Sequence, residues 1–143
     1  MSFHDRFKEM KVSGDFSGLG ESLPYSKFMG MSVEIVDGRL ITSMAYDDKL
    51  IGNTVLPALH GGTLAALLEA AALFQIAYDL ETEAMPKVIT LTVDYMRSGG
   101  PKLTRARAEA TRVGRRVANV RAEAWQDDPA KPITAANINF LLS

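Results

Sequence analysis

The sequence contains no cysteine and only two histidines, His4 and His60, among its 143 residues. The absence of cysteine excludes disulfides, thiolate catalysis and cysteine-rich zinc or iron–sulfur sites. Two histidines are too few for a histidine-based metal cage, and the alternative is a mixed site with carboxylate ligands. We therefore predict a protein that uses neither a metal ion nor a redox cofactor.

The sequence also has little net charge, because 16 lysine and arginine residues nearly balance 17 aspartate and glutamate residues. This balance gives no global attraction to nucleic acid or to a membrane of anionic lipid, so we expect neither as a partner. The first residues include Asp5 and Glu9 and lack the apolar core of a signal peptide, which predicts a cytoplasmic protein. The length fits one domain over residues 1–143, with an N-terminal helix and loop in residues 1–22.

One long apolar segment, residues 59–80, dominates the middle of the chain. It is apolar almost all the way round a helix, which predicts a buried central helix rather than a surface helix or a membrane span. Within it, Glu69 has only alanine and leucine three and four positions away, so it has no partner on its own helix. A carboxylate in this setting is a candidate catalytic group, and the alternative is a structural acid that hydrogen-bonds across a dimer.

Hydrophobic periodicity predicts six strands around this helix. Asp37-Gly38 between the first two strands is typical of a hairpin turn, because glycine adopts positive φ without strain. Short links between the later strands imply antiparallel neighbours, and alternating alanines in two of them would let the helix pack close to the sheet. The predicted fold class is α+β. The expected helices are residues 3–12, 24–28 and 59–80, the expected strands are residues 31–36, 40–46, 88–96, 103–113, 117–126 and 133–142, and loops are expected at 47–58 and 81–86.

Residues 59–69, LHGGTLAALLE, resemble the hotdog-fold acyl-CoA thioesterases, and in particular the phenylacetate-pathway-like branch of that family. The similarity lies in an HGG motif at a helix start with an acidic residue two turns later, in residues 51–53 (IGN) and in residues 93–97 (VDYMR). It extends from about residue 24 to the C-terminus. The resemblance implies a hotdog fold, in which a curved antiparallel sheet of about six strands wraps one long helix, and hydrolysis of an acyl-CoA thioester.

The resemblance also implies roles for individual residues. Glu69 would be the catalytic carboxylate, acting as a nucleophile on the thioester carbonyl or as a general base for water. The backbone N–H of Gly61 would bind the thioester oxygen. Asn53 lies close to the position of an amide that positions water in relatives, but its spacing to His60 is one residue longer, so Asn53 and Thr54 are alternatives.

The residues themselves are suited to this chemistry. Gly61 and Gly62 stand at the start of the predicted helix, where unpaired N–H groups and the helix dipole favour negative charge. Gly61 and Glu69 are eight positions apart, about 12 Å along a helix at ~1.5 Å per residue. One carbonyl carbon cannot contact both, so we predict a homodimer with two shared sites, and pairing into a dimer of dimers stays open.

Further residues are candidates for contacts to the substrate, of which coenzyme A is a part. Arginines near two predicted turns are suited to the phosphates of coenzyme A, and solvated hairpin ends are the alternative. The histidine before the helix is either a substrate contact or a helix cap, and the second glycine either admits the substrate or permits close packing. The candidate substrate-binding residues are His60, Gly62, Thr54, Arg97, Arg115 and Arg116.

Two other functions are compatible with the predicted fold. A non-catalytic acyl-CoA-binding or scaffold protein would keep the fold without turnover, and the acid at Glu69 argues against it. A hydratase or dehydratase of the same fold would pair a histidine with a carboxylate, and the scarcity of histidine argues against that activity. The leading prediction is an acyl-CoA thioesterase.

Overall fold

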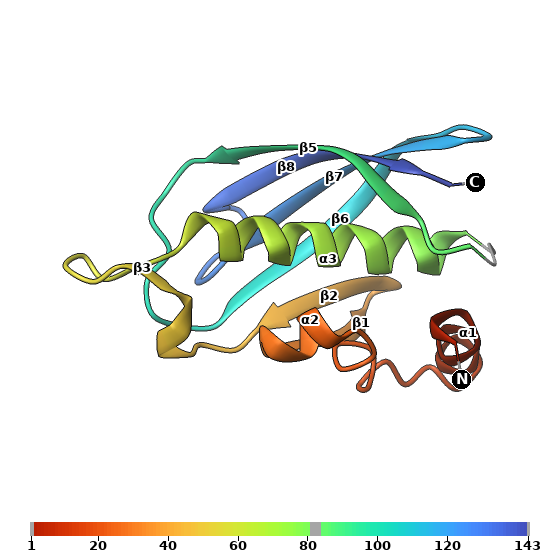
Figure 1. The fold of residues 1–143 in the computed structure, drawn as a ribbon, viewed down its shortest axis with the longest axis horizontal. Helices are drawn as coiled ribbons and strands as arrows, with labels where there is room; N and C mark the ends of the chain where they lie inside the picture. Colours follow the sequence, from red (N-terminus) through yellow and green to blue (C-terminus); the bar gives the residue numbers. More distant parts are fainter. Residues whose placement is uncertain (1, 81–83, 143) are drawn as a thin grey trace.

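The computed structural model describes residues 2–80 and 84–142 and contains a long helix, α3 (Gly61–Asp79), packed on one face of a six-stranded antiparallel sheet (Figure 1). The strand order is β1-β2-β6-β7-β8-β5, so β1 and β5 form the edges. Two shorter helices, α1 (Phe3–Ser13) and α2 (Pro24–Phe28), precede the sheet. The predicted α+β architecture is confirmed. The strands are β1 (Met31–Val36), β2 (Arg39–Met44), β5 (Lys87–Tyr95), β6 (Thr104–Val113), β7 (Val117–Trp125) and β8 (Thr134–Leu141).

The face of the sheet toward α3 is lined with small residues, as the alternating alanines predicted. Five alanines of β6 and β7 are at most 1% exposed, and the large apolar side chains of α3 are buried against them. Small side chains let the helix lie close to the sheet, so an almost wholly apolar helix fits there. By its length and mean hydropathy of 1.3, α3 would suit a membrane crossing, but here it is the core helix. The alanines are Ala106, Ala108, Ala118, Ala122 and Ala124.

The predicted hairpin joins β1 and β2. Asp37 and Gly38 form a two-residue turn with φ of 51° and 78°, between the paired residues Val36 and Arg39. Positive φ at both central positions belongs to the hairpin turn whose twist matches that of the flanking strands, and glycine adopts it without strain. The turn therefore sets the register of the first two strands.

The ladder between β2 and β6 stops at Thr42, and side chains replace it beyond that point. The N–H of Leu40 donates to Oε1 of the buried Gln75 at 3.0 Å. Nη2 of Arg39 donates to the carbonyl of Ala108 at 2.9 Å. Without these contacts a backbone donor and a backbone acceptor inside the sheet would lose their partners. The gap between the two strands thus explains why a glutamine lies in the core helix.

The segment before α3 differs from the predicted loop at residues 47–58. It contains a 3-10 turn, η1 (Asp48–Leu50), and a separate two-stranded sheet formed by β3 (Ile51–Asn53) and β4 (Ala58–Leu59). Strands of three and two residues are too short to show a hydrophobic period, so the sequence pattern could not reveal them. The predicted exit loop at residues 81–86 lies partly outside the described residues.

Helix α3 begins at Gly61, two residues later than predicted. The N–H of Leu59 donates to the carbonyl of Gly99 at 2.9 Å, and the N–H of His60 donates to the carbonyl of Leu50 at 2.8 Å. These bonds to other segments hold residues 59 and 60 in extended backbone. The helix therefore starts at the glycine pair, at the left end of α3 in Figure 1.

The N-terminal helix α1 packs near the other end of α3 (Figure 1). Phe7 and Phe16 are buried, and the ring of Phe16 lies 5.6 Å from the ring of Tyr78 in an edge-on arrangement. Nζ of Lys11 donates to the carbonyl of Tyr78 at 2.8 Å. A cation at the C-terminal end of a helix complements its dipole, so α1 closes the end of α3 that carries no glycines.

Candidate active site

His60 is the N-cap of α3. Its Nδ1 accepts the N–H of Gly62 at 2.8 Å, and its carbonyl accepts the N–H of Thr63 at 3.0 Å. A β-carbon built on Gly62 would lie 2.9 Å from Nδ1 of His60, so a glycine at this position gives the imidazole room to cap the helix. The cap satisfies two of the backbone donors that a helix start leaves unpaired.

Gly61 keeps a free backbone donor beside this cap. Its N–H has no acceptor in the described part of the chain, while its carbonyl accepts the hydroxyl of Tyr95 at 2.8 Å. A β-carbon built on Gly61 would lie 3.1 Å from two ring carbons of Tyr95. The first N–H of α3 therefore points away from protein acceptors at the positive end of the helix dipole. Tyr95 is a site residue to which the sequence analysis assigned no role.

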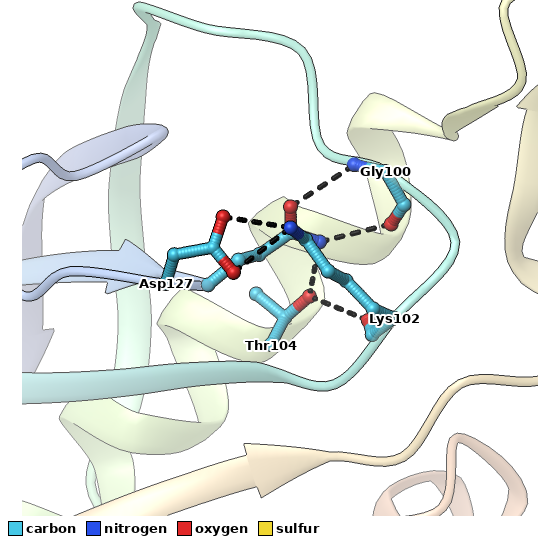
Figure 2. Close-up of polar contacts among 5 residues, drawn as sticks. Gly100, Lys102, Thr104 and Asp127 are labelled. Atoms are coloured by element: carbon cyan, nitrogen blue, oxygen red, sulfur yellow. Dashed lines mark hydrogen bonds and ion pairs between the residues drawn. The ribbon is translucent and has the colours of Figure 1, made fainter.

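A hollow of about 350 Å³ adjoins Gly61 and is lined by Leu64, Tyr95 and Arg97, among others. The loop that follows Arg97 is held by polar contacts shown in Figure 2. The side chain of Gln126 accepts the N–H of Gly100 at 3.0 Å and donates to its carbonyl at 2.9 Å. This bidentate contact holds the loop directly after Gly99, which lines the hollow.

The same loop carries an exposed ion pair, in which Nζ of Lys102 lies 2.7 Å from an oxygen of Asp127 (Figure 2). Both side chains are largely solvated, so the pair adds little stability. Lys102 and Arg97 nevertheless line one further depression of about 280 Å³, next to the hollow at Gly61. The cationic groups of Arg97 and Lys102 therefore lie close to the start of α3.

Glu69 lies two turns into α3, eight residues from Gly61, or about 12 Å at ~1.5 Å per residue. It is half-buried, and its carboxylate has no hydrogen bond or ion pair within residues 2–80 and 84–142. Ala65, Leu73 and Ala77 are also half-buried and lie on the same face as Glu69 at helical spacing. One face of α3 is thus left partly uncovered, and the carboxylate lies on it.

Asn53 is the last residue of β3, and Thr54 begins the loop between β3 and β4; both residues are exposed. Oδ1 of Asn53 accepts the N–H groups of Val55 and Leu56 at 3.0 and 3.1 Å, an arrangement in which asparagine shapes its own turn. Thr54 is exposed in the same turn. Both residues lie on the Gly61 side of the molecule rather than beside Glu69 of the same chain.

The candidate arginines lie at opposite ends of the sheet. Arg97 follows the last residue of β5 near Gly61, and its Nη1 donates to the carbonyl of Pro132 at 2.7 Å. Arg115 and Arg116 lie in the β6–β7 turn, which meets β8 near the first residue of β5. The nine residues of β5 span about 26 Å at ~3.3 Å per residue. A single chain therefore brings Arg97, and not the other two arginines, to Gly61.

The sequence matches a known protein family, and the fold is similar to those of solved structures. Residues 53–141 match the acyl-CoA thioesterase N-terminal domain family. A protein of solved structure from Chromobacterium violaceum is 34% identical, with 97% of each chain covered and a TM-score of 0.78. A phenylacetic acid degradation-related protein from Ralstonia eutropha is 25% identical, with 88% of this chain and 98% of that chain covered and a TM-score of 0.74. The curated proteins gave no match to this sequence.

Proposed function

The chain belongs to the acyl-CoA thioesterase family and has the hotdog fold, and on this basis we propose that it hydrolyses an acyl-CoA thioester at a site containing Glu69 and Gly61. One observation carries the assignment of these residues. On the same helix, Glu69 presents a carboxylate without a partner in the described residues, and Gly61 presents an N–H without an acceptor there. A thioesterase needs both a base or nucleophile and an oxyanion donor.

The proposed reaction uses the two groups at opposite sides of the thioester carbonyl. The N–H of Gly61, at the positive end of α3, donates to the carbonyl oxygen and stabilises the negative charge that develops on it. Glu69 removes a proton from the attacking water, or attacks the carbonyl carbon itself and forms an anhydride that water then hydrolyses. Collapse of the tetrahedral intermediate breaks the C–S bond and releases the coenzyme A thiolate. The amide of Asn53 or the hydroxyl of Thr54 positions the water.

The separation of Gly61 and Glu69 leads us to propose a homodimer. Because about 12 Å separates them on one helix, Glu69 would act with Gly61 of a second copy whose α3 runs antiparallel to the first. The edge strand β5 supports such pairing. Among the described residues β8 is the one strand that bonds to it, and Val88 and Ile89 are 37% and 52% exposed. An open apolar edge of this kind is a template for pairing with another chain.

The proposed substrate contacts follow from the same arrangement. Arg97 lies on the chain that supplies Gly61, where it would bind a phosphate of coenzyme A. Arg115 and Arg116 would contribute from the other subunit, whose α3 runs antiparallel past Gly61. We also propose that the chain belongs to the phenylacetate-pathway-like branch of the family, a proposal supported by the 25% identity to the phenylacetic acid degradation-related protein of Ralstonia eutropha.

The test is release of free thiol from short, medium, long and aryl acyl-CoA substrates by the parent and by Glu69→Gln. We expect the parent to release thiol and Glu69→Gln to be at least about 100-fold slower, the scale of a lost general base. Glu109→Gln, on an exposed position of β6, is the matched control and should behave as the parent. Unchanged release in Glu69→Gln would remove Glu69 from the mechanism, and binding without release by the parent would indicate a scaffold protein.

A further inference from the structure

Tyr95 is the last residue of the edge strand β5, and its side chain reaches the first residue of α3. The hydroxyl donates to the carbonyl of Gly61 at 2.8 Å, although 34 positions separate the two residues in the sequence. The phenol ring occupies the space that a side chain on Gly61 would need, at 3.1 Å from a built β-carbon. Tyr95 thus touches Gly61 on the carbonyl side and on the α-carbon side.

The start of α3 is held from two directions. His60 Nδ1 accepts the N–H of Gly62, and the Tyr95 hydroxyl donates to the carbonyl of Gly61, so both contacts act on the peptide group that joins the two glycines. Two successive glycines are the most flexible backbone a helix start can have. With that peptide fixed, the N–H of Gly61 remains at the helix end without an acceptor among the described residues.

We propose that Tyr95 is a positioning residue, which holds Gly61 so that its N–H meets the oxygen of the thioester in the transition state. The inference rests on the proposed function, because it assigns Gly61 as the oxyanion donor. An oxyanion donor works only within about 2.7–3.1 Å of the developing charge, and a misplacement of about 1 Å can cost 10²-fold in rate. A flexible pair of glycines needs an external contact to meet this tolerance.

The first experiment measures kcat and KM for Tyr95→Phe, which removes the hydroxyl and keeps the ring. We expect kcat to fall about 10- to 100-fold with KM nearly unchanged, because the lost contact acts on transition-state stabilisation. Tyr46→Phe is the matched control, since it also removes a hydroxyl hydrogen bond, from Tyr46 to Asp48, in an exposed segment. An unchanged kcat in Tyr95→Phe, or a rise in KM alone, would overturn the proposal.

A second readout does not depend on turnover. Amide hydrogen exchange at Gly62 should be faster in Tyr95→Phe than in the parent, and equal to the parent in Tyr46→Phe, because only the first variant frees the glycine peptide. Exchange that does not change would overturn the positioning role even in an active enzyme. A parent without thioesterase activity would instead contradict the proposed function, and the exchange result would still decide whether Tyr95 holds the turn.

A double substitution tests whether Tyr95 acts through Gly61. In Gly61→Ala the new β-carbon would press on the Tyr95 ring, so the hydroxyl contact should already be disturbed. Tyr95→Phe should then reduce kcat much less in the Gly61→Ala background than in the parent. Equal reductions in the two backgrounds would show that Tyr95 acts independently of Gly61, contrary to the proposal.

Discussion

Gln75 and Glu69 are two polar residues of the same apolar helix, six positions apart, with opposite environments. Gln75 is 4% exposed, and its amide accepts the N–H of Leu40 and donates to Asp79 at 2.9 Å. Glu69 is half-buried and has no partner in the described residues of its own chain. Buried polar groups in folded proteins are normally paired. The structure of one chain therefore explains the glutamine, whereas the half-buried carboxylate of Glu69 is left open to solvent and, in our proposal, to the substrate.

The pairing of Gln75 gives a prediction at the scale of one residue. Gln75→Leu keeps nearly the same volume but leaves the N–H of Leu40 without an acceptor where β2 and β6 separate. We expect the free energy of unfolding to fall by about 1–3 kcal/mol, the cost of an unsatisfied buried donor. Urea denaturation followed by circular dichroism measures it.

The control for this substitution is Asp79→Asn, which changes the exposed partner of Gln75 and leaves the bond to Leu40 in place. It should shift the unfolding midpoint far less than Gln75→Leu. Equal midpoints for Gln75→Leu and the parent would mean that water, or a rearranged strand, satisfies the N–H of Leu40.

Helix α1 gives a prediction at the scale of an element. Ser2 caps the helix, because its Oγ accepts the N–H of Asp5 at 3.1 Å, and the hydroxyl donates to the Asp5 carboxylate at 2.8 Å. The hydroxyl bond lowers the pKa of Asp5 from its ordinary value of 3.8. A lowered pKa in the folded form stabilises the helix above the ordinary value, and this stabilisation is lost as the pH falls through the lowered pKa.

Ser2→Ala should therefore raise the pKa of Asp5 toward its ordinary value and make amide exchange in α1 faster near neutral pH, by about fivefold for a lost cap of about 1 kcal/mol. An NMR titration and hydrogen exchange measure both effects. Ser17→Ala is the control, because Ser17 acts on the pKa of Asp15 and not on that of Asp5. A pKa of Asp5 that stays low in Ser2→Ala would show that another group holds the carboxylate.

Some helices and strands could be predicted from the sequence, and others could not. The long helix was predicted from its hydrophobic spacing, and the Asp37-Gly38 hairpin was predicted from a residue pair suited to a turn with positive φ. Both are local patterns in the sequence. The sheet formed by β3 and β4 depends on bonds between distant segments, such as Leu59 to Gly99, which no local pattern contains. The predicted start of α3 was two residues too early for the same reason, because bonds to distant segments hold residues 59 and 60 in extended backbone.

In the candidate site too, local patterns could be predicted from the sequence and contacts between distant residues could not. Glu69 and Gly61 were predicted from a carboxylate in an apolar helix, from glycines at a helix start and from the family resemblance, and their roles stay predictions. The contact of Tyr95 with Gly61 joins residues 34 positions apart, so only the fold reveals it. Arg97 and Arg115 look alike beside their turns, and only the strand order places them at opposite ends of the sheet.

At the scale of the whole molecule, the central question is how one chain completes a site with its two candidate groups about 12 Å apart. An antiparallel pair of α3 helices brings Glu69 of each copy to Gly61 of the other if the twofold axis passes near Ala65, midway between them. Ala65 is small and half-buried on the partly uncovered face, which suits close approach of two helices. The proposed dimer therefore has a definite register.

Mixed dimers test this register directly. Chains carrying Glu69→Gln and chains carrying Gly61→Pro are co-expressed with different tags, and the heterodimer is purified. Proline is tolerated at the first position of a helix, and it removes the N–H of Gly61. Each homodimer should be inactive. The heterodimer should regain about half of the parent activity, because one of its two sites combines the intact Glu69 of one chain with the intact Gly61 of the other.

The reciprocal heterodimer separates shared sites from sites within one chain. Here both substitutions lie on one chain, and the other chain is unaltered. If the sites are shared, each site receives one defective group, either the glutamine that replaces Glu69 or the proline that replaces Gly61, and the heterodimer is inactive. If one chain holds a complete site, the unaltered chain keeps about half of the parent activity. The shared-site arrangement is overturned if this heterodimer keeps half of the parent activity and the heterodimer with one substitution on each chain is inactive. One subunit would then have to bridge the separation of about 12 Å by a change of its conformation.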